Sequence, residues 1–255
     1  MAIKKSELYS TLWKCCDELR GGMDASEYKD YVLVILFVKY ISDKKHSDPK
    51  FDIEIPEGCY FEDFVLLKGK DIIGEEINKK ISSLAEKNQL SNVFTADFDD
   101  DNKLGKGKDK VNTLSNLISI FQNENLNFGK NRAADDDLIG DAYEYLMKNF
   151  ATQSGKSKGQ FYTPAEVSRV MAKVIGLNNL NNKKNTTIYD PTCGSGSLLL
   201  KAMNEAPNGA TIYGQEKDNS TVGLAKMNMI LHNELYADIQ QGDTITSPQL
   251  KKKEN

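Results

Sequence analysis

Residues 188–197 read IYDPTCGSGS and decide the fold of the second half of this 255-residue sequence. A strand is expected to end at Asp190, and Gly194-Ser195-Gly196 allows a sharp turn into a helix. Because glycine has no Cβ, the backbone there can approach a bound ligand and direct its N–H groups toward it. The end of a strand and the start of a helix are also where open α/β sheets bind nucleotides. We therefore expect a nucleoside-type ligand at this turn.

Strand and helix patterns alternate around this stretch. We expect strands at residues 187–190, 211–216 and 237–240, and helices at residues 197–204 and 219–232. Alternation at this spacing predicts a parallel sheet with right-handed crossovers. Upstream, Thr163-Pro164-Ala165-Glu166 has the pattern of a capping box with proline at the first helical position. The helix that it opens is expected to end at Gly176.

Two further acids are placed to bind a nucleoside. Glu216 ends the second expected strand, where a carboxylate accepts hydrogen bonds from ribose hydroxyls, and Asp243 follows the third, placed to accept from an adenine amino group. Asp190 would repel a pyrophosphate and attract the ammonium group of an amino-acid moiety. Leu199 holds the position of the third glycine of a dinucleotide fingerprint, and no Gly-Lys-Ser/Thr follows. The residues thus favour S-adenosylmethionine over ATP or NAD, with a dehydrogenase as the weaker alternative.

The first part of the chain predicts helices alone. Apolar residues recur at helical spacing in four segments, at residues 8–19, 28–36, 73–84 and 111–121. Ser6 and Asp24 are placed to cap the first two helices. Residues 97–110 are charged and contain glycine, which is typical of an exposed connection. We predict a helical N-terminal domain at residues 1–130 and an α/β domain at residues 131–255.

Three features lie near the expected domain boundary. Asp135-Asp136-Asp137 is expected to open a helix, since acids suit the positive end of a helix dipole. Residues 152–159 (TQSGKSKG) are expected to form a loop. The net charge of −4 is carried entirely by residues 1–130.

Composition excludes several classes of protein. With 39% hydrophobic and 27% charged residues, the chain fits a globular protein rather than a disordered or collagen-like one. The longest apolar stretch, residues 31–41, is shorter than the roughly 20 residues that cross a bilayer. No charged-then-apolar leader is present, so we expect a cytoplasmic protein with reduced thiols and no membrane contact. Four cysteines without a C-x-x-C pair and two histidines predict no metal site.

Several separated motifs carry a resemblance to a known family. They are residues 155–169 (GKSKGQFYTPAEVSR), 188–202 (IYDPTCGSGSLLLKA), 212–232 (IYGQEKDNSTVGLAKMNMILH), 12–43 and 135–151. Together they resemble the modification (M) subunit of type I restriction–modification systems, over nearly the whole chain. The resemblance implies a DNA adenine-N6 methyltransferase with a Rossmann-like domain that uses S-adenosylmethionine. It also implies a specificity (S) subunit, a second M subunit and a restriction (R) subunit as partners. Because the chain is acidic, contact with DNA needs a local basic surface or a partner subunit.

The resemblance also implies roles for individual residues. The segment that covers the methionine end of the cofactor corresponds to Gln160, Phe161, Tyr162, Thr163, Pro164 and Ala165, with Thr163 suited to hold the carboxylate. The glycine loop beneath the cofactor corresponds to Asp190, Gly194, Ser195, Gly196 and Ser197, with Glu216 at the ribose and Asp243 near the adenine. The residues leave alternatives open: Thr163 as a helix cap only, and Phe161 and Tyr162 as a seal between domains.

One element of the family pattern is missing. The family orients the target adenine with Asn/Asp-Pro-Pro-Tyr/Phe after its fourth strand, but all six prolines here are isolated, so no catalytic residue is assigned. In the family topology the fourth strand pairs with the first, which predicts an unpaired edge at residues 187–190. We expect the N-terminal portion of a truncated or split M subunit, inactive alone. The alternative is a non-catalytic module for assembly or DNA docking.

Overall fold

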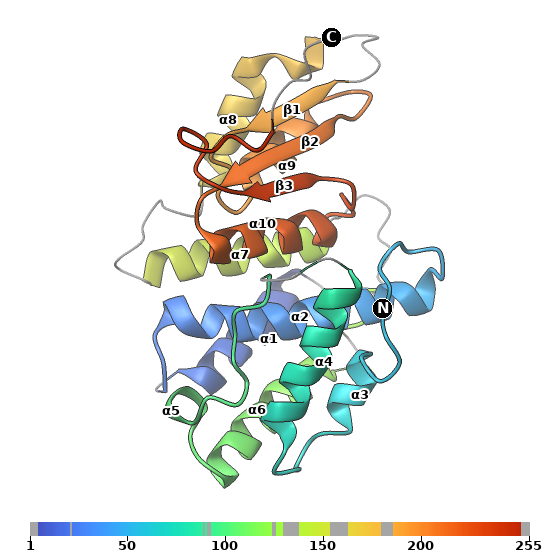
Figure 1. Ribbon diagram of the computed structural model, residues 1–255, viewed down its shortest axis with the longest axis vertical. Coiled ribbons are helices and arrows are strands. Elements are labelled where there is room, and N and C mark those ends of the chain that lie inside the picture. Colours follow the sequence, from blue (N-terminus) through green and yellow to red (C-terminus); the bar gives the residue numbers. More distant parts are fainter. Residues whose placement is uncertain are drawn as a thin grey trace. The chain divides into compact units, whose positions relative to one another are not determined.

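The computed structural model describes residues 5–20, 22–88, 90, 93–123, 126–129, 138–153, 163–179 and 186–250. The chain forms two compact units, Met1–Ser154 and Gly155–Asn255. Among the described residues, the first unit is helical and the second is α/β, as expected (Figure 1). No helix within these ranges is long and apolar enough to span a membrane.

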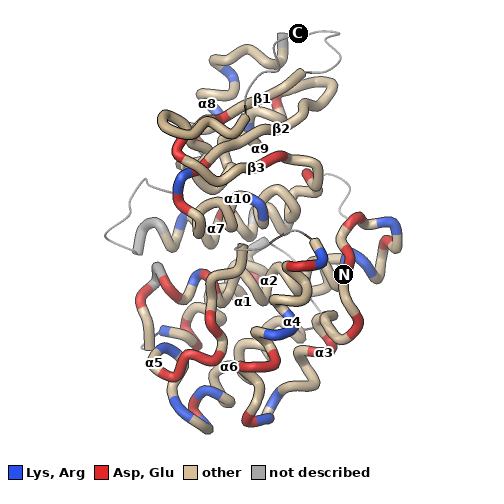
Figure 2. The backbone as a smooth tube through the Cα atoms, viewed as in Figure 1, with Lys and Arg blue, Asp and Glu red and all other residues tan. Residues whose placement is uncertain are grey.

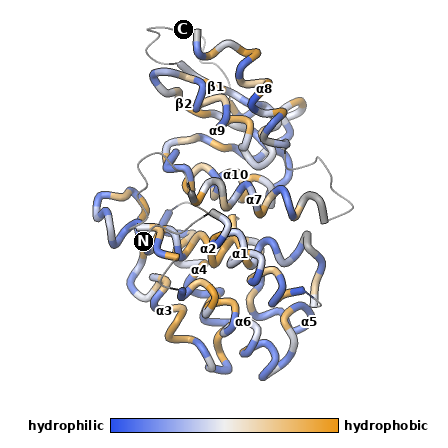
Figure 3. The backbone as a smooth tube through the Cα atoms, turned by 180° about the vertical axis from the view of Figure 1, so that it is seen from behind, coloured by the Kyte–Doolittle hydropathy of each residue, from blue (hydrophilic) through white to orange (hydrophobic). Residues whose placement is uncertain are grey.

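The helical unit is organised around one apolar helix. Its helices are α1 (Lys5–Leu19), α2 (Ala25–Ser47), α3 (Phe61–Val65), α4 (Ile73–Lys87), α5 (Asp101–Leu104), α6 (Lys108–Phe121) and α7 (Leu138–Gln153). Residues 31–43 of α2 are all buried, and α2 packs against α1, α3, α6 and α7. Figure 3 shows the hydrophobic colouring along α2. A helix that is apolar on all sides is stable only when other elements surround it.

Polar groups buried in α2 are paired. The Lys39 ammonium lies 2.7 Å from Asp43 Oδ1, and the backbone N–H of Phe128 donates to Asp43 Oδ2 over 3.0 Å. Ser42 Oγ accepts from the backbone N–H of Phe61 at 2.9 Å. Burial raises the pKa of the Asp43 carboxyl, and the Lys39 ammonium opposes that shift. These bonds attach α2 to segments distant in the sequence.

The expected starts of these helices are partly confirmed. Asp24 caps α2, and Glu27 Oε2 accepts from the Asp24 backbone N–H at 3.3 Å. The cap at Ser6 is wrong, because α1 already begins at Lys5. Residues 97–110 are not a simple exposed connection, since they hold α5 and the start of α6, beside acidic stretches visible in Figure 2. The side chain of Lys110 is 10% exposed because its ammonium bridges Asp99 and Asp101 at 2.6 and 2.9 Å.

Helix α7 packs within the helical unit. Its buried residues include Ala142, Tyr143, Leu146, Met147 and Phe150. Tyr145 stacks on Tyr9 of α1 with a centroid distance of 4.1 Å, and Phe150 meets Tyr28 of α2 edge to face. Residues 135–137 lie outside the described residues. Packing thus divides the chain after Ser154, and the boundary at residue 130 stays a prediction.

The α/β unit contains the expected parallel sheet. Strands β1 (Thr187–Asp190), β2 (Thr211–Glu216) and β3 (Asp238–Gln241) lie in the order β1-β2-β3, with Ile188 beside Ile212 and Gly214 beside Ile239. The first two strands have the predicted bounds, and β3 is shifted by one residue. Helices α9 (Ser197–Asn204) and α10 (Asn219–Leu231) connect the strands, which confirms the alternation.

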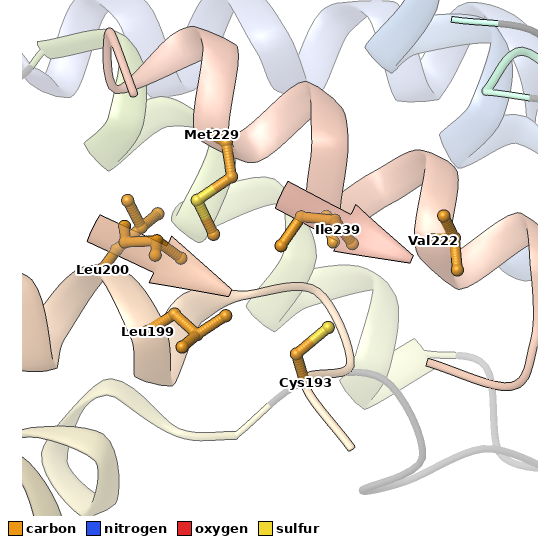
Figure 4. Packing of buried hydrophobic residues seen from close by; sticks show 8 residues of the cluster. Cys193, Leu199, Leu200, Val222, Met229 and Ile239 are labelled. Atoms are coloured by element: carbon orange, nitrogen blue, oxygen red, sulfur yellow. The ribbon is translucent and has the colours of Figure 1, made fainter. Parts of the chain in front are cut away.

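Both connecting helices cover the same face of the sheet. Leu199 and Leu200 of α9 pack with Met229 of α10 and Ile239 of β3 in one cluster (Figure 4). Gly214 permits this packing, since a Cβ there would lie 2.7 Å from Ile239 Cδ1. The same Cβ would lie 3.1 Å from Leu199 Cδ1 of α9, so the close packing of α9 on β2 depends on a residue without a side chain.

Strand β1 lies at the edge of the described sheet, and its second edge is unpaired, as predicted. Helix α8 (Ala165–Ile175) packs against α9 through Ala172. Its remaining apolar residues are exposed: Val167, Val170, Met171, Val174 and Ile175. Gly176 ends α8 at φ +74°, as expected. The capping box is wrong, because Pro164 occupies the N-cap and has no side-chain donor or acceptor for capping.

Candidate functional site

The loop after β1 lies at the carboxyl ends of the strands. Gly194 and Gly196 both have positive φ, +54° and +78°, in the left-handed region that favours glycine. The Gly196 N–H donates to the Cys193 carbonyl at 2.8 Å, which closes the turn. The Cys193 N–H donates to the Gln215 carbonyl at 3.0 Å and continues the contact with β2. The loop is therefore a defined turn attached to the neighbouring strand.

Glu216 joins this loop to the end of β2. Its Oε2 accepts from the Gly194 N–H at 3.1 Å, and its Oε1 accepts from the Asp218 N–H at 2.9 Å. An ionised carboxylate offers about four acceptor positions, so these two bonds leave acceptor capacity for a ligand. Two residues selected from sequence 22 positions apart are thus in direct contact.

Asp190 ends β1 and lies at the same edge. Its Oδ1 accepts from the Thr192 N–H at 2.9 Å. Burial raises the pKa of the Asp190 carboxyl, the Thr192 hydrogen bond opposes the shift, and the Glu216 charge adds to it. Two carboxylates at adjacent strand ends make a site that favours a cationic group and disfavours a pyrophosphate.

The serines of the loop point into the protein. Ser195 and Ser197 are 2% and 3% exposed, and their hydroxyl oxygens lie 3.1 Å apart. The Ser195 carbonyl accepts from Asn228 Nδ2 at 2.9 Å, and Asn228 is fully buried in α10. The buried Ser195–Ser197 contact and the bond from Asn228 therefore stabilise the conformation of the loop.

Asp243 follows β3 and is already bonded within its own turn. Its Oδ1 accepts from the N–H groups of Ile245 and Thr246 at 3.0 and 3.2 Å, and its Oδ2 lies 3.0 Å from Lys217 Nζ. The Lys217 ammonium, followed by these two N–H groups, lowers the pKa of the Asp243 carboxyl. Since Lys217 follows Glu216, Asp243 is held at the same end of the sheet.

The remaining residues precede or begin α8. Thr163 is half-buried, Pro164 is exposed, and Ala165 is the first residue of the helix. Gln160, Phe161 and Tyr162 lie outside the described residues. The parts of the chain that are described contain no cluster of three His, Cys, Asp or Glu residues that could hold a metal ion.

Comparison with known proteins matches both parts of the chain to known families. The model of the HsdM N-terminal domain matches residues 8–121, and that of the N-6 DNA Methylase family matches residues 134–255. The MpnII type I restriction enzyme methylase subunit of Mycoplasma pneumoniae is 30% identical over 94% of this chain and 53% of its own length. The chain belongs to the type I methylase subunit family.

Further relatives agree with this placement. The MjaVIII methylase subunit of Methanocaldococcus jannaschii is 31% identical over 98% of this chain and 45% of its own length. A type I methyltransferase subunit from Streptococcus thermophilus has a solved structure that is 29% identical with a TM-score of 0.82, over 98% of this chain and 61% of that one. The chain therefore spans about half the length of the curated relatives it matches.

Two buried carboxamides at this site were not identified from the sequence. Asn228 supports the glycine loop, and Gln215, fully buried in β2, bonds to the segment after β3. Asn228 stands between Met227 and Met229 in the apolar second half of α10, and that placement is a signal that could have drawn attention to it. Gln215 had no such signal, since it lies next to Glu216 and reads as part of the strand.

Proposed function

We propose that this chain supplies the S-adenosylmethionine-binding part of a type I DNA adenine-N6 methyltransferase. The observation that carries the proposal is the 3.1 Å bond between Glu216 and the Gly194 N–H, with Asp190 at the adjacent strand end. The bond joins an acid suited to ribose, Glu216, to a loop that permits close approach of the backbone. Asp190, an acid suited to an ammonium group, lies beside them. S-adenosylmethionine presents both ribose hydroxyls and an ammonium group, so the donor and acceptor set fits it.

Each residue would hold a distinct part of the cofactor. Asp190 would pair with the ammonium group, Glu216 would accept from the ribose hydroxyls, and Asp243 would accept from the adenine amino group. The residues before α8 (Gln160, Phe161, Tyr162, Thr163, Pro164 and Ala165) would cover the methionine end. When bound, the cofactor supplies a methyl group activated by its sulfonium charge. Gly194 and Gly196 permit the left-handed backbone conformation that shapes the loop beside the cofactor.

Methylation of adenine requires more than a cofactor site. Adenine-N6 methylation requires the base to leave the duplex and its amine to be oriented. The Asn/Asp-Pro-Pro-Tyr/Phe motif that would orient it does not occur in these 255 residues. We propose that the S subunit, a second M subunit and DNA complete the active assembly in the cytoplasm, that an R subunit can join it, and that the chain by itself does not methylate DNA.

Calorimetry with S-adenosylmethionine and with NAD tests the cofactor. We expect the wild-type chain to bind S-adenosylmethionine, and Glu216→Gln to weaken that binding by about tenfold or more, since a lost charge-assisted hydrogen bond costs roughly 1.5–3 kcal/mol. Glu205→Gln, at the end of α9, is the matched control and should bind as the wild type does. Tight binding of NAD without binding of S-adenosylmethionine would favour the dehydrogenase alternative.

A methylation assay tests the activity. The chain is incubated with labelled S-adenosylmethionine and DNA, with and without an S subunit. We expect no N6-methyladenine from the chain alone. Robust formation of N6-methyladenine by the chain alone would contradict this part of the proposal.

A non-catalytic assembly module is the second candidate. In that role the helical unit docks on the S subunit, DNA or a second M subunit, and the α/β unit serves as a scaffold. The reading frame downstream of Asn255 separates the candidates. An Asn-Pro-Pro-Phe-like segment there, in frame or after a shift, identifies a truncated or split methyltransferase.

A further inference from the structure

Gln215 is buried on a face of the sheet that the helices do not cover. Ile212 and Ile239 belong to the cluster beneath α9 and α10, and side chains alternate along a strand. Gln215 therefore points to the opposite face, on which Tyr189 of β1 is 44% exposed. Gln215 is nevertheless fully buried. Something other than a helix covers it.

The covering element is the segment that follows β3, residues 243–249, here called the crossing segment. Gln215 Nε2 donates to the Ser247 carbonyl at 3.0 Å, and the Gln249 N–H donates to Gln215 Oε1 at 3.0 Å. One side chain thus satisfies both a backbone acceptor and a backbone donor, as a neighbouring strand would. Figure 1 shows the chain after β3 returning across the strands.

The crossing segment also contacts both loops of the candidate site. Thr244 Oγ1 donates to the Pro191 carbonyl in the loop after β1. Asp243 pairs with Lys217 in the loop after β2. The segment therefore runs along the carboxyl ends of β1 and β2, where Asp190 and Glu216 lie.

These attachments differ in strength. The Lys217 side chain is 76% exposed, and an exposed ion pair contributes little to stability because water screens it. A buried carboxamide that loses its partners is much more costly, because its donor and acceptor are then unsatisfied away from water. Gln215 is bonded at both ends and is fully buried, so it attaches the segment more strongly than the exposed pair of Asp243 and Lys217.

We propose that Gln215 is a positioning residue that holds the crossing segment against the carboxyl ends of β1 and β2, so that this segment forms one wall of the cofactor site and keeps Asp243 at its adenine end. The inference rests on the proposed function for its cofactor. Its mechanical part, the attachment of the segment, is independent of any ligand.

Hydrogen exchange on the full chain tests the attachment. In the wild type, the Gln249 amide should be protected, and Gln215→Leu should raise its exchange rate at least tenfold. Gln215→Glu retains an acceptor for the Gln249 N–H but loses the donor to the Ser247 carbonyl, so it should restore only part of that protection. Gln240→Leu is the matched control, because Gln240 is an exposed amide on β3 that bonds to Asp238. Unchanged exchange at Gln249 in Gln215→Leu overturns the proposal.

Calorimetry with S-adenosylmethionine tests the positioning role. Gln215→Leu should weaken binding by about 5–50-fold, while Gln240→Leu leaves it unchanged. Unaltered affinity in Gln215→Leu overturns the positioning role alone. If the wild type does not bind, the proposed function and this role fall together, whereas the exchange result still decides the attachment.

A second pair of variants approaches the contact from the exposed side. Gln249→Pro removes the N–H that donates to Gln215, and Gln249→Ala retains it. Both changes lie near the end of the described chain, outside the core, so folding should be preserved even if Gln215→Leu fails to fold. We expect Gln249→Pro, but not Gln249→Ala, to weaken S-adenosylmethionine binding by about 5–50-fold. Equal affinities of these two variants contradict the proposal.

Discussion

Gly196 is constrained both by its backbone and by its surroundings. Its φ of +78° is costly for any residue with a side chain, and an added Cβ would lie 2.5 Å from Met229 Cε. Gly209, in the turn before β2, has a similar φ of +72° but no atom within 4 Å of an added Cβ. A comparison of alanine substitutions at the two glycines therefore distinguishes the cost of backbone strain from the cost of steric contact.

We expect Gly196→Ala to lower the free energy of unfolding by about 1.5–3 kcal/mol, since the flexible Met229 side chain can shift in part, and Gly209→Ala to lower it by about 1 kcal/mol. Urea denaturation monitored by circular dichroism measures both values. Equal losses in the two variants would mean that Met229 moves aside and that the packing under the loop is loose.

Asp190 gives the site a dependence on pH. Because burial raises the pKa of this carboxyl, the folded chain binds the proton more tightly than the unfolded chain does. Its contribution to stability is therefore greatest at low pH and is lost as the pH rises through the folded pKa. Binding of an ammonium group has the opposite sign, since it needs the ionised form.

We expect the affinity for S-adenosylmethionine to be full at neutral pH and to fall as the pH drops through a pKa above the ordinary value of about 3.9. Asp190→Asn should weaken binding about 10–100-fold at neutral pH and remove this dependence. Calorimetric titrations at several pH values check both expectations, with Asp238→Asn as the control. A persistent acid limb in Asp190→Asn would assign the titration to another group.

At the scale of elements, α8 buries one side only. Ala172 is fully buried against α9, whereas Val174 is 81% exposed two residues later. An exposed apolar row beside the unpaired edge of β1 is an aggregation liability.

We expect Val174→Lys to leave the melting temperature of the chain within about 2 °C of the wild type and to reduce its self-association. Ala172→Lys should lower the free energy of unfolding by more than about 3 kcal/mol, since it places a charge in a packed contact. Thermal melts and light scattering distinguish these effects. Strong destabilisation by Val174→Lys would show that this face is covered in solution.

At the scale of the whole molecule, the chain forms two compact units, and each has its own buried apolar residues. The contacts of α7 with α1 and α2 complete the first core, although its residues lie within the match to the N-6 DNA Methylase family. Division by packing and division by sequence family thus fall at different places.

We expect residues 1–154 to fold cooperatively as a separate piece. Residues 1–130 should unfold at a lower urea concentration, because removal of α7 exposes apolar side chains of α1 and α2. Urea titrations of the two pieces measure the difference. Equal midpoints would place α7 outside the cooperative unit and favour the boundary at residue 130.

Much of the α/β unit follows from local pattern. IYDPTCGSGS predicts β1, the glycine turn and the start of α9. It does so because strand propensity, the conformational freedom of glycine and the start of a helix each depend on only a few neighbouring residues. The parallel pairing follows as well, since alternating strands and helices leave few topologies. Residues 97–110 are mostly exposed, as expected, but the burial of Lys110 in an ion pair with Asp99 and Asp101 was not predicted, because the charge pattern does not show which side chains pair. The capping role of Thr163 was predicted wrongly, because Pro164 holds the N-cap of α8.

The sequence by itself determined the class of fold, the order of its elements and the acids at the strand ends, because these depend on side-chain chemistry and short-range periodicity. Only the tertiary structure decided that Glu216 bonds to Gly194, that the loop serines point inward and that Gln215 holds the segment after β3. Those contacts join residues far apart in the chain, and only the folded backbone brings their hydrogen-bonding groups within 3 Å or so of each other.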